Sequence, residues 1–328
     1  MIRLPDPAVA LDAAAAEAAF GDILDGRVDD GAIHDFLLGI TLRDETAPEI
    51  AGATRALRAR MIRVAAPAGA IDVCGTGGDG AHSLNISTAV AIVVAACGVP
   101  VAKHGNRAAS SKAGAADTLE ALGLNLDRAS ASAKESLNAL GIAFLFAQKH
   151  HPALGRLAPI RRAIGRRTIL NLLGPLANPA GVTRQLIGVA RVDYLPTFTA
   201  ALAMLGSDAA LVVSGEDSLD ELSIAGPSRA LAIGPCGPPE QTIVPEDCGL
   251  TRHPLDSLRG GDPAFNAAAL TALLDGAPGA YRDAVVLNTA GALIVAGLAA
   301  DWPAGAALAA AAIDDGRSAA LLRAWLAF

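Results

Sequence analysis

Short apolar runs separated by longer amphipathic segments form the main pattern of this chain beyond residue 70. Five runs have the composition of buried strands, and they lie at residues 71–74, 99–102, 144–146, 186–189 and 210–213. Segments of helical character, such as residues 195–205, fall between them. Strands that alternate with helices indicate a largely parallel sheet covered on both faces.

The first part of the chain is predicted to be helical instead. Residues 10–65 carry helix-type patterning, and we expect a helix start at Thr46 and breaks at Gly21, Gly26, Gly39 and Pro48. Residues 67–69 (Pro-Ala-Gly) are the first plausible domain junction. With 328 residues and 52% hydrophobic content, the chain can bury a large core, and we expect two domains.

Charge and cysteine usage narrow the class of protein. The formal net charge of −7 argues against nucleic acid as a partner. The four cysteines are scattered without metal-type spacing, which is typical of a reduced cytosol, and the start of the chain lacks the apolar core of a signal peptide. The longest apolar runs are too short to span a bilayer. We therefore expect a cytoplasmic protein without membrane or nucleic-acid partners.

A glycine-rich turn follows the first predicted strand. Four glycines within residues 75–80 allow positive φ and let backbone N–H groups converge on an anion. Ser87 and Thr88 are placed to cap the helix that follows, whose N-terminus favours phosphate. Asp79 fits a sugar hydroxyl or a metal better than phosphate itself. The turn could also be only a tight connection, since such glycine patterns are weak signals.

The second predicted strand is followed by further anion-binding side chains. Lys103 supplies a point charge, Arg107 a planar fork, and Ser110 and Ser111 two hydroxyls. The carboxyl ends of parallel strands meet at one edge of a sheet, so these groups should lie beside the glycine turn. The alternative is a solvated basic turn.

Several longer motifs resemble one family, the anthranilate phosphoribosyltransferases. They occur in the expected order from about residue 20 to the C-terminus: GTGGDG at 75–80, NIST at 85–88, KHGNR at 103–107, APIR at 158–161, RTILNLLGPLANP at 167–179 and DSLDE at 217–221. The resemblance implies an α/β fold with a small discontinuous all-helical domain and a larger α/β domain around a central, largely parallel sheet. The small domain would comprise residues 1–66 with a returning helical piece near 162–179, and the large domain residues 67–161 and 180–328. The active site would lie in the cleft between them, and the family is usually homodimeric through the small domain.

The implied reaction moves the phosphoribosyl group of phosphoribosyl pyrophosphate to the amine of anthranilate, in tryptophan biosynthesis. The products would be N-(5-phosphoribosyl)anthranilate and pyrophosphate. The resemblance implies Mg²⁺ as cofactor, with two ions per site, and Ser87, Asp220 and Glu221 as metal ligands. No general base is assigned, because the lone pair of an aniline nitrogen is free at neutral pH.

The same resemblance implies two groups of substrate-binding residues. Anthranilate would be held by Gly75, His104, Asn106 and Arg161, with Arg161 facing its carboxylate. Phosphoribosyl pyrophosphate would be held by Gly75, Gly78, Asp79, Ser83, Asn85, Ile86, Ser87, Thr88, Lys103, Arg107, Ala108, Ala109, Ser110, Ser111 and Ala115. Without the resemblance, Asp220 and Glu221 would be interpreted as a solvated acidic turn, and Arg161 as part of a charged helix face. His151 could be structural or functional.

The chain departs from the family pattern at a few positions. Ala115 replaces a usual serine, Ser214 a histidine, Ser218 a glycine and Leu170 a phenylalanine. These changes leave open a phosphoribosyltransferase of the same fold with a different aromatic acceptor. A non-catalytic relative that binds a ligand or nucleic acid is a further alternative, but it would need a basic surface and a degraded acidic pair.

Overall fold

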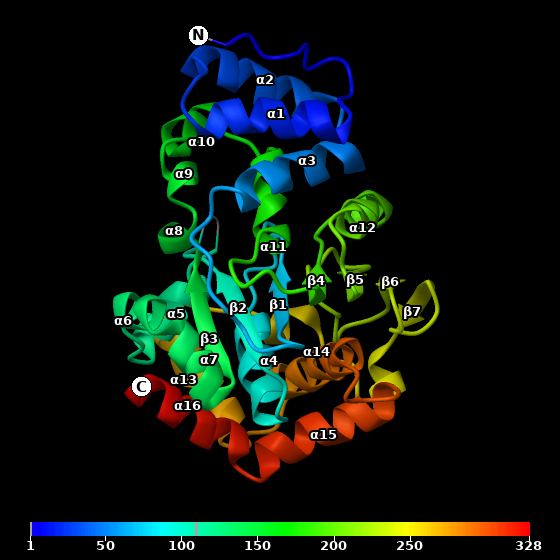
Figure 1. Cartoon of the computed structure of the whole chain (residues 1–328). Helices are drawn as coiled ribbons and strands as arrows, with labels where there is room; N and C mark the ends of the chain where they lie inside the picture. Colours follow the sequence, from blue (N-terminus) through cyan, green and yellow to red (C-terminus); the bar gives the residue numbers. More distant parts are fainter. Residues whose placement is uncertain (1, 109–110) are drawn as a thin grey trace.

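The computed structural model describes residues 2–108 and 111–328. Its centre is a seven-stranded sheet of order β3-β2-β1-β4-β5-β6-β7 (Figure 1). The first five strands are parallel, and β6 and β7 extend one edge in antiparallel fashion. The strands are β1 (Ile71–Gly75), β2 (Val101–Gly105), β3 (Ile142–Phe146), β4 (Arg184–Gly188), β5 (Ala209–Gly215), β6 (Ser228–Ile233) and β7 (Glu240–Ile243).

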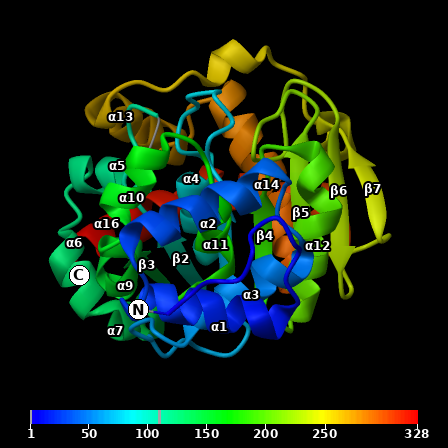
Figure 2. The same cartoon turned by 90° about the horizontal axis from the view of Figure 1, so that it is seen from above.

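A helical layer lies at one end of the molecule, above the sheet in Figure 1 and across it in Figure 2. It contains α1 (Ala13–Leu24), α2 (Asp30–Leu42) and α3 (Ala47–Arg58), joined by α10 (Ala158–Ile164), η1 (Ile169–Asn171) and α11 (Leu173–Leu176). The later elements return along the chain to pack on α2 and α3. Phe20, Phe36 and Leu57 share one buried cluster with Ile187 and Val212 of the sheet, so the layer and one sheet face form a continuous core.

The remaining helices bury the other face and the edges of the sheet. Helix α4 packs on β1 and β2, and α14 packs against α4, α15 and several strands. The bounds are α4 (Ile86–Ala96), α5 (Ala115–Ala121), α6 (Leu126–Ala131), α7 (Ala133–Leu140), α8 (Ala147–His150), α9 (Pro152–Gly155), η2 (Val192–Tyr194), α12 (Leu195–Met204), η3 (Pro245–Cys248), η4 (Leu255–Leu258), α13 (Pro263–Leu274), α14 (Ala280–Ala296), α15 (Trp302–Asp314) and α16 (Arg317–Ala327). None of the helices in the described residues is long and apolar enough to cross a membrane.

The predicted α/β fold class is therefore confirmed, and the five predicted strands all exist. The helix start at Thr46 is also confirmed, because the Thr46 N–H donates to Glu49 Oε2 at 2.9 Å in a capping box. The predicted breaks at Gly21 and Gly39 are wrong, since both residues lie inside helices. Gly39 instead leaves room for the Pro7 ring, which a Cβ would crowd. The domain boundaries given above stay predictions.

Two other local predictions are corrected. The second strand begins at Val101 and not at residue 99, because it follows Pro100, whose carbonyl accepts from the Ile71 N–H at 2.9 Å. Lys103 and His104 therefore lie inside β2 and not beyond its end. The helix after the glycine turn has Asn85 as its N-cap, so Ser87 and Thr88 lie within its first turn. Strand β7 (Glu240–Ile243) was missed because it has no apolar run, and β6 was missed although residues 230–233 (Ala-Leu-Ala-Ile) form a short one.

Candidate functional site

The glycine turn lies at the carboxyl edge of the sheet, where β1 and β4 end side by side. Gly75 and Gly188 are register partners, and both face the segment that carries Asp220. A Cβ at Gly75 would overlap the Asp220 carboxylate, and one at Gly188 would overlap the Asp220 carbonyl. These two glycines thus admit the acidic segment into the sheet edge. Gly75 was predicted to serve a substrate, and its contact here is with Asp220.

The turn itself has the backbone conformation that an anion-binding loop requires. Gly77, Gly78 and Gly80 have φ of 66°, 72° and 77°, in the region that disfavours side chains. The Gly77 N–H donates to Asp220 Oδ2 at 2.6 Å. Among the described residues the Gly78 N–H has no hydrogen-bond partner, so it can donate to a ligand. The Asp79 carboxylate accepts from the Ala81 N–H at 3.1 Å and closes the far side of the turn.

Lys103 reaches this edge from inside the sheet. Its side chain is only 2% exposed, and its Nζ donates to the Val73 carbonyl at 2.9 Å and to Ser87 Oγ at 3.2 Å. A buried ammonium with two acceptors of this kind keeps one N–H for a further partner. The alternative of a solvated basic turn is therefore wrong for Lys103, and the predicted proximity of Lys103 to Ser87 is confirmed.

The acidic pair consists of a half-buried Asp220 and a buried Glu221, and it is short of positive charge. Glu221 is 9% exposed, and burial raises its pKa to about 7, with Asp79 adding to the shift while Lys103 and the N–H and hydroxyl of Ser87 oppose it. Burial also raises the pKa of Asp220 well above its usual value, with Glu221 and Asp79 adding to the effect. Three carboxylates thus share one ammonium, so the solvated acidic turn is excluded.

This donor set fits a hard divalent cation that completes its shell with substrate oxygens. No group of three or more His, Cys, Asp or Glu side chains in the described part of the chain forms a metal cage by itself. Mg²⁺ is usually bound by one or two carboxylates together with substrate phosphates and waters, not by such a cage. Asp220 and Glu221, with the Ser87 hydroxyl beside them, match that requirement.

A second set of side chains lies on the helical side of the edge. Arg161, on α10, is half-buried, and its guanidinium has no hydrogen bond or ion pair with any described side chain. Burial alone lowers the pKa of Arg161, since no carboxylate lies near enough to raise it. A desolvated cation without a counter-charge is costly unless a ligand supplies the anion. The basic-face reading of Arg161 is therefore disfavoured.

His104 and His151 form a buried pair next to this region. Their ring centroids are 5.1 Å apart, and His104 Nδ1 is 2.9 Å from the Gly174 carbonyl. That contact requires Nδ1 to carry the proton and leaves Nε2 as an acceptor without a partner in the described structure. Burial lowers the pKa of His104 to about 3 and that of His151 to about 4, so both rings are neutral.

Some predicted substrate-binding residues are engaged elsewhere. The Asn85 amide oxygen accepts from Thr118 at 2.5 Å and from Asn266 at 2.9 Å, so this side chain braces helix packing. Arg107 pairs with Asp117 at 2.8 Å and also contacts Glu120. The Asn85 amide oxygen is thus occupied, whereas Arg107 uses only Nη1 in these pairs and its side chain is 41% exposed.

The other predicted residues line the same turn or its neighbouring loop. Asn106 is exposed and its Oδ1 accepts from the Arg107 N–H at 2.8 Å. Ser83 pairs with Arg259 across a β-bridge, and Ile86 begins α4. Thr88 is buried, and its hydroxyl has no hydrogen-bond partner among the residues that the structure describes. Ala108, Ser111 and Ala115 border α5, whereas Ala109 and Ser110 lie outside the described residues.

The structure shows the surroundings of three residues that depart from the family pattern. Ser218 has φ of 69°, the conformation for which glycine is the natural residue, so the serine is held in a strained turn. The Ser214 hydroxyl is fully buried without a partner among the described groups. Leu170 is buried in the helical layer.

Arg167 is the residue that sequence reasoning missed. It follows α10 and donates from Nη2 to the Thr76 carbonyl at 2.9 Å and from Nη1 to the Gly77 carbonyl. A Cβ at Gly78 would overlap its guanidinium. Its position at the start of the RTILNLLGPLANP motif was the only available signal.

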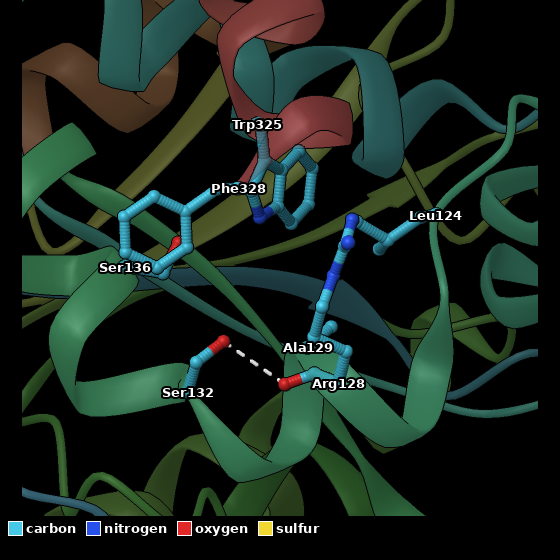
Figure 3. Close-up of a pocket in the computed structure, with 7 residues that line it drawn as sticks. All are labelled: Leu124, Arg128, Ala129, Ser132, Ser136, Trp325 and Phe328. Atoms are coloured by element: carbon cyan, nitrogen blue, oxygen red, sulfur yellow. Dashed lines mark hydrogen bonds between the residues drawn. The ribbon is translucent and has the colours of Figure 1, made fainter.

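A crevice near the C-terminus can be set aside as a substrate site. It lies between α6, α7 and α16 and is lined by Leu124, Arg128, Ala129, Ser132, Ser136, Trp325 and Phe328 (Figure 3). Its volume of about 10 Å³ holds at most one water. A crevice of this size cannot hold either proposed substrate.

Comparison with known proteins gives a consistent result. The family described as "Glycosyl transferase family, a/b domain" matches residues 68–319, and "Glycosyl transferase family, helical bundle domain" matches residues 8–61. The chain is 60% identical over 327 residues to an anthranilate phosphoribosyltransferase of Novosphingobium aromaticivorans, covering 100% of this chain and 99% of the relative.

Two solved structures are similar over nearly the whole chain. The anthranilate phosphoribosyltransferase of Thermus thermophilus superposes with a TM-score of 0.93 at 39% identity, covering 98% of this chain and 96% of that one. The Saccharomyces cerevisiae enzyme in complex with phosphoribosyl pyrophosphate and Mg has a TM-score of 0.89 at 27% identity, with 97% and 93% covered.

Proposed function

The chain belongs to the anthranilate phosphoribosyltransferase family, and from this premise we propose that it transfers the phosphoribosyl group of phosphoribosyl pyrophosphate to the amine of anthranilate. The products are N-(5-phosphoribosyl)anthranilate and pyrophosphate, and the reaction belongs to tryptophan biosynthesis. One observation carries the proposal: two charge imbalances occur, one at the sheet edge and one on α10, whose following segment contacts the glycine turn through Arg167. Asp220 and Glu221 lack a sufficient counter-cation, and Arg161 lacks a counter-anion.

The donor occupies the glycine turn in this account. The Gly78 N–H and the Lys103 ammonium donate to phosphate oxygens. In the first turn of α4, the Thr88 N–H has no hydrogen-bond partner in the described residues and adds a further donor. Asp220, Glu221 and Ser87 hold Mg²⁺, as two ions per site. When bound, Mg²⁺ neutralises charge that builds on the departing pyrophosphate. Asp79 approaches the ribose hydroxyls or the metal.

The acceptor lies between the turn and the helical layer. The Arg161 fork binds both oxygens of the anthranilate carboxylate, while His104 and Asn106 border the ring. Burial lowers the pKa of His104 to about 3, so its Nε2 is only a weak proton acceptor, and the carboxylates serve the metal. The described residues therefore offer no strong general base beside the amine. None is needed, since the aniline lone pair is already free. Catalysis then rests on holding the amine in line with the anomeric carbon.

A panel of acceptors tests the proposed function. Purified protein with phosphoribosyl pyrophosphate and Mg²⁺ should consume anthranilate, bind benzoate only as an inhibitor, and use aniline poorly because it lacks the carboxylate. The alternative of another aromatic acceptor is favoured by the Ser214 and Ser218 departures. Equal use of aniline and anthranilate would reject the assignment of anthranilate.

The metal assignment has its own test. Asp220→Asn combined with Glu221→Gln removes the charges that hold Mg²⁺ while keeping both shapes. We expect turnover to fall by several orders of magnitude because the metal is lost. Folding should persist, because the variant relieves repulsion between the adjacent carboxylates. Normal turnover of the double variant in Mg²⁺ would show that the pair does not bind the metal.

A homodimer formed through the helical layer and a cytoplasmic location complete the proposal. Val9 and Leu42 leave aliphatic surface exposed on that side of the molecule, at 61% and 67%. Sedimentation equilibrium should give twice the chain mass, and a monomer would contradict it.

A further inference from the structure

Arg167 contacts the glycine turn from outside the residues that hold substrate. Its two hydrogen bonds end on consecutive carbonyls, those of Thr76 and Gly77. Each carbonyl shares a trans peptide with the next N–H, which points the opposite way. Holding the carbonyls toward Arg167 therefore aims the N–H groups of Gly77 and Gly78 away from it.

The two aimed N–H groups face the functional edge. The Gly77 N–H meets Asp220 Oδ2 at 2.6 Å, whereas the Gly78 N–H has no partner in the described residues. The first peptide is thus fixed from both sides, by Arg167 and by Asp220. The second is fixed from one side only and leaves its N–H for the ligand. Glycines at positive φ have no side chain to hold such a turn, so an external brace matters.

Arg167 is itself mounted on a defined segment. Gly165 ends α10 with φ of 66°, and the Thr168 N–H donates to Asn171 Oδ1 at 3.0 Å in a capping box. Only Arg166 and Arg167 lie between these two anchors. The same α10 carries Arg161, so one short piece of chain contacts both halves of the proposed site.

We propose that Arg167 is a positioning residue that holds the 76–78 turn in its donor-binding conformation. The inference rests on the proposed function, since it names what holds the donor loop of that same site. Arg167 acts through the backbone and need not contact the substrate. Its neighbour Arg166 has the same charge and is exposed, but it has no hydrogen bond or ion pair with the described residues, which makes it a matched control.

The test compares Arg167→Ala, Arg167→Lys and Arg166→Ala with the native protein. Two charge-assisted contacts are lost in Arg167→Ala, so we expect the apparent KM and the calorimetric Kd for phosphoribosyl pyrophosphate with Mg²⁺ to rise at least about tenfold. The KM for anthranilate should change less than about twofold on that account. Arg167→Lys should recover part of the loss, because one ammonium cannot reproduce the fork. Arg166→Ala should behave as native.

Hydrogen exchange without ligand separates positioning from direct substrate contact. Amides of residues 76–80 should exchange faster in Arg167→Ala while the rest of the protein keeps its protection. Unchanged exchange there, unchanged donor affinity, or an equal loss in Arg166→Ala would each overturn the proposal. If the native protein does not use anthranilate, the proposed function fails, but donor calorimetry and exchange still judge Arg167.

Discussion

Replacing Arg161 by alanine should weaken the binding of anthranilate and leave that of phosphoribosyl pyrophosphate unchanged. In the ligand-free protein the guanidinium is half-buried and contacts no described acid. Its removal therefore breaks no internal ion pair. The variant should therefore lose binding energy only when anthranilate binds and its carboxylate lacks the guanidinium.

The loss of affinity for anthranilate follows from the contact that is removed. A hydrogen bond to a charged group contributes about 1.5–3 kcal/mol, which corresponds to roughly 10- to 150-fold in affinity. The KM for anthranilate should rise by that factor, and the KM for phosphoribosyl pyrophosphate should stay unchanged. Arg161→Lys should recover only part, because an ammonium cannot bond both carboxylate oxygens in one plane. The melting temperature should stay within about 2 °C of native, because no internal pair is broken.

The assay is steady-state loss of anthranilate at saturating donor, with Arg162→Ala as control. Arg162 neighbours Arg161 on α10 but is exposed and unpaired among the described residues, so its removal changes net charge equally. Benzoate should inhibit the native protein and not Arg161→Ala. If anthranilate and donor weaken together, or if Arg162→Ala loses as much, the assignment of Arg161 to the acceptor carboxylate is refuted.

Two further predictions concern the glycine contact and the histidine pair. Gly75→Ala places a Cβ on the Asp220 carboxylate and should abolish turnover. Gly155→Ala is the control and should be active, because a Cβ there meets no described atom within 4 Å. Equal activity of the two variants would contradict the close contact between Gly75 and Asp220. His104 and His151 have folded pKa values of about 3 and 4, below the unfolded value of 6.5, so the unfolded state binds more protons. The free energy of unfolding should therefore fall as pH drops below 6.5, by about 2 kcal/mol per ring at pH 5. In urea unfolding, His104→Gln should remove part of that loss. A pH dependence that is the same in this variant and the native protein would contradict the buried neutral pair.

The sequence could predict the elements but not how they meet. Apolar runs located five strands, and the rule that the carboxyl ends of parallel strands share one edge placed Lys103 beside the glycine turn and its helix, where Lys103 contacts Ser87. Lys103 was expected beyond its strand because lysine rarely lies inside a buried one. In the structure the Val73 carbonyl and the Ser87 hydroxyl satisfy it there, and both come from distant positions.

The sequence also could not predict which partners the side chains contact. Asn85 stands in a phosphate-loop motif, yet its amide turns to Thr118 and Asn266, which lies 181 residues away along the chain. Arg167 was one of several arginines in a basic stretch, and only the packing of the returning segment against the turn distinguishes it. Both features depend on long-range contacts, which local patterns do not encode.

The reaction itself tests the central claim most directly. Native protein mixed with phosphoribosyl pyrophosphate, Mg²⁺ and anthranilate should release one pyrophosphate for each anthranilate consumed, and chelation of the metal should stop both. Pyrophosphate release without anthranilate loss, or no reaction with either, would contradict the account.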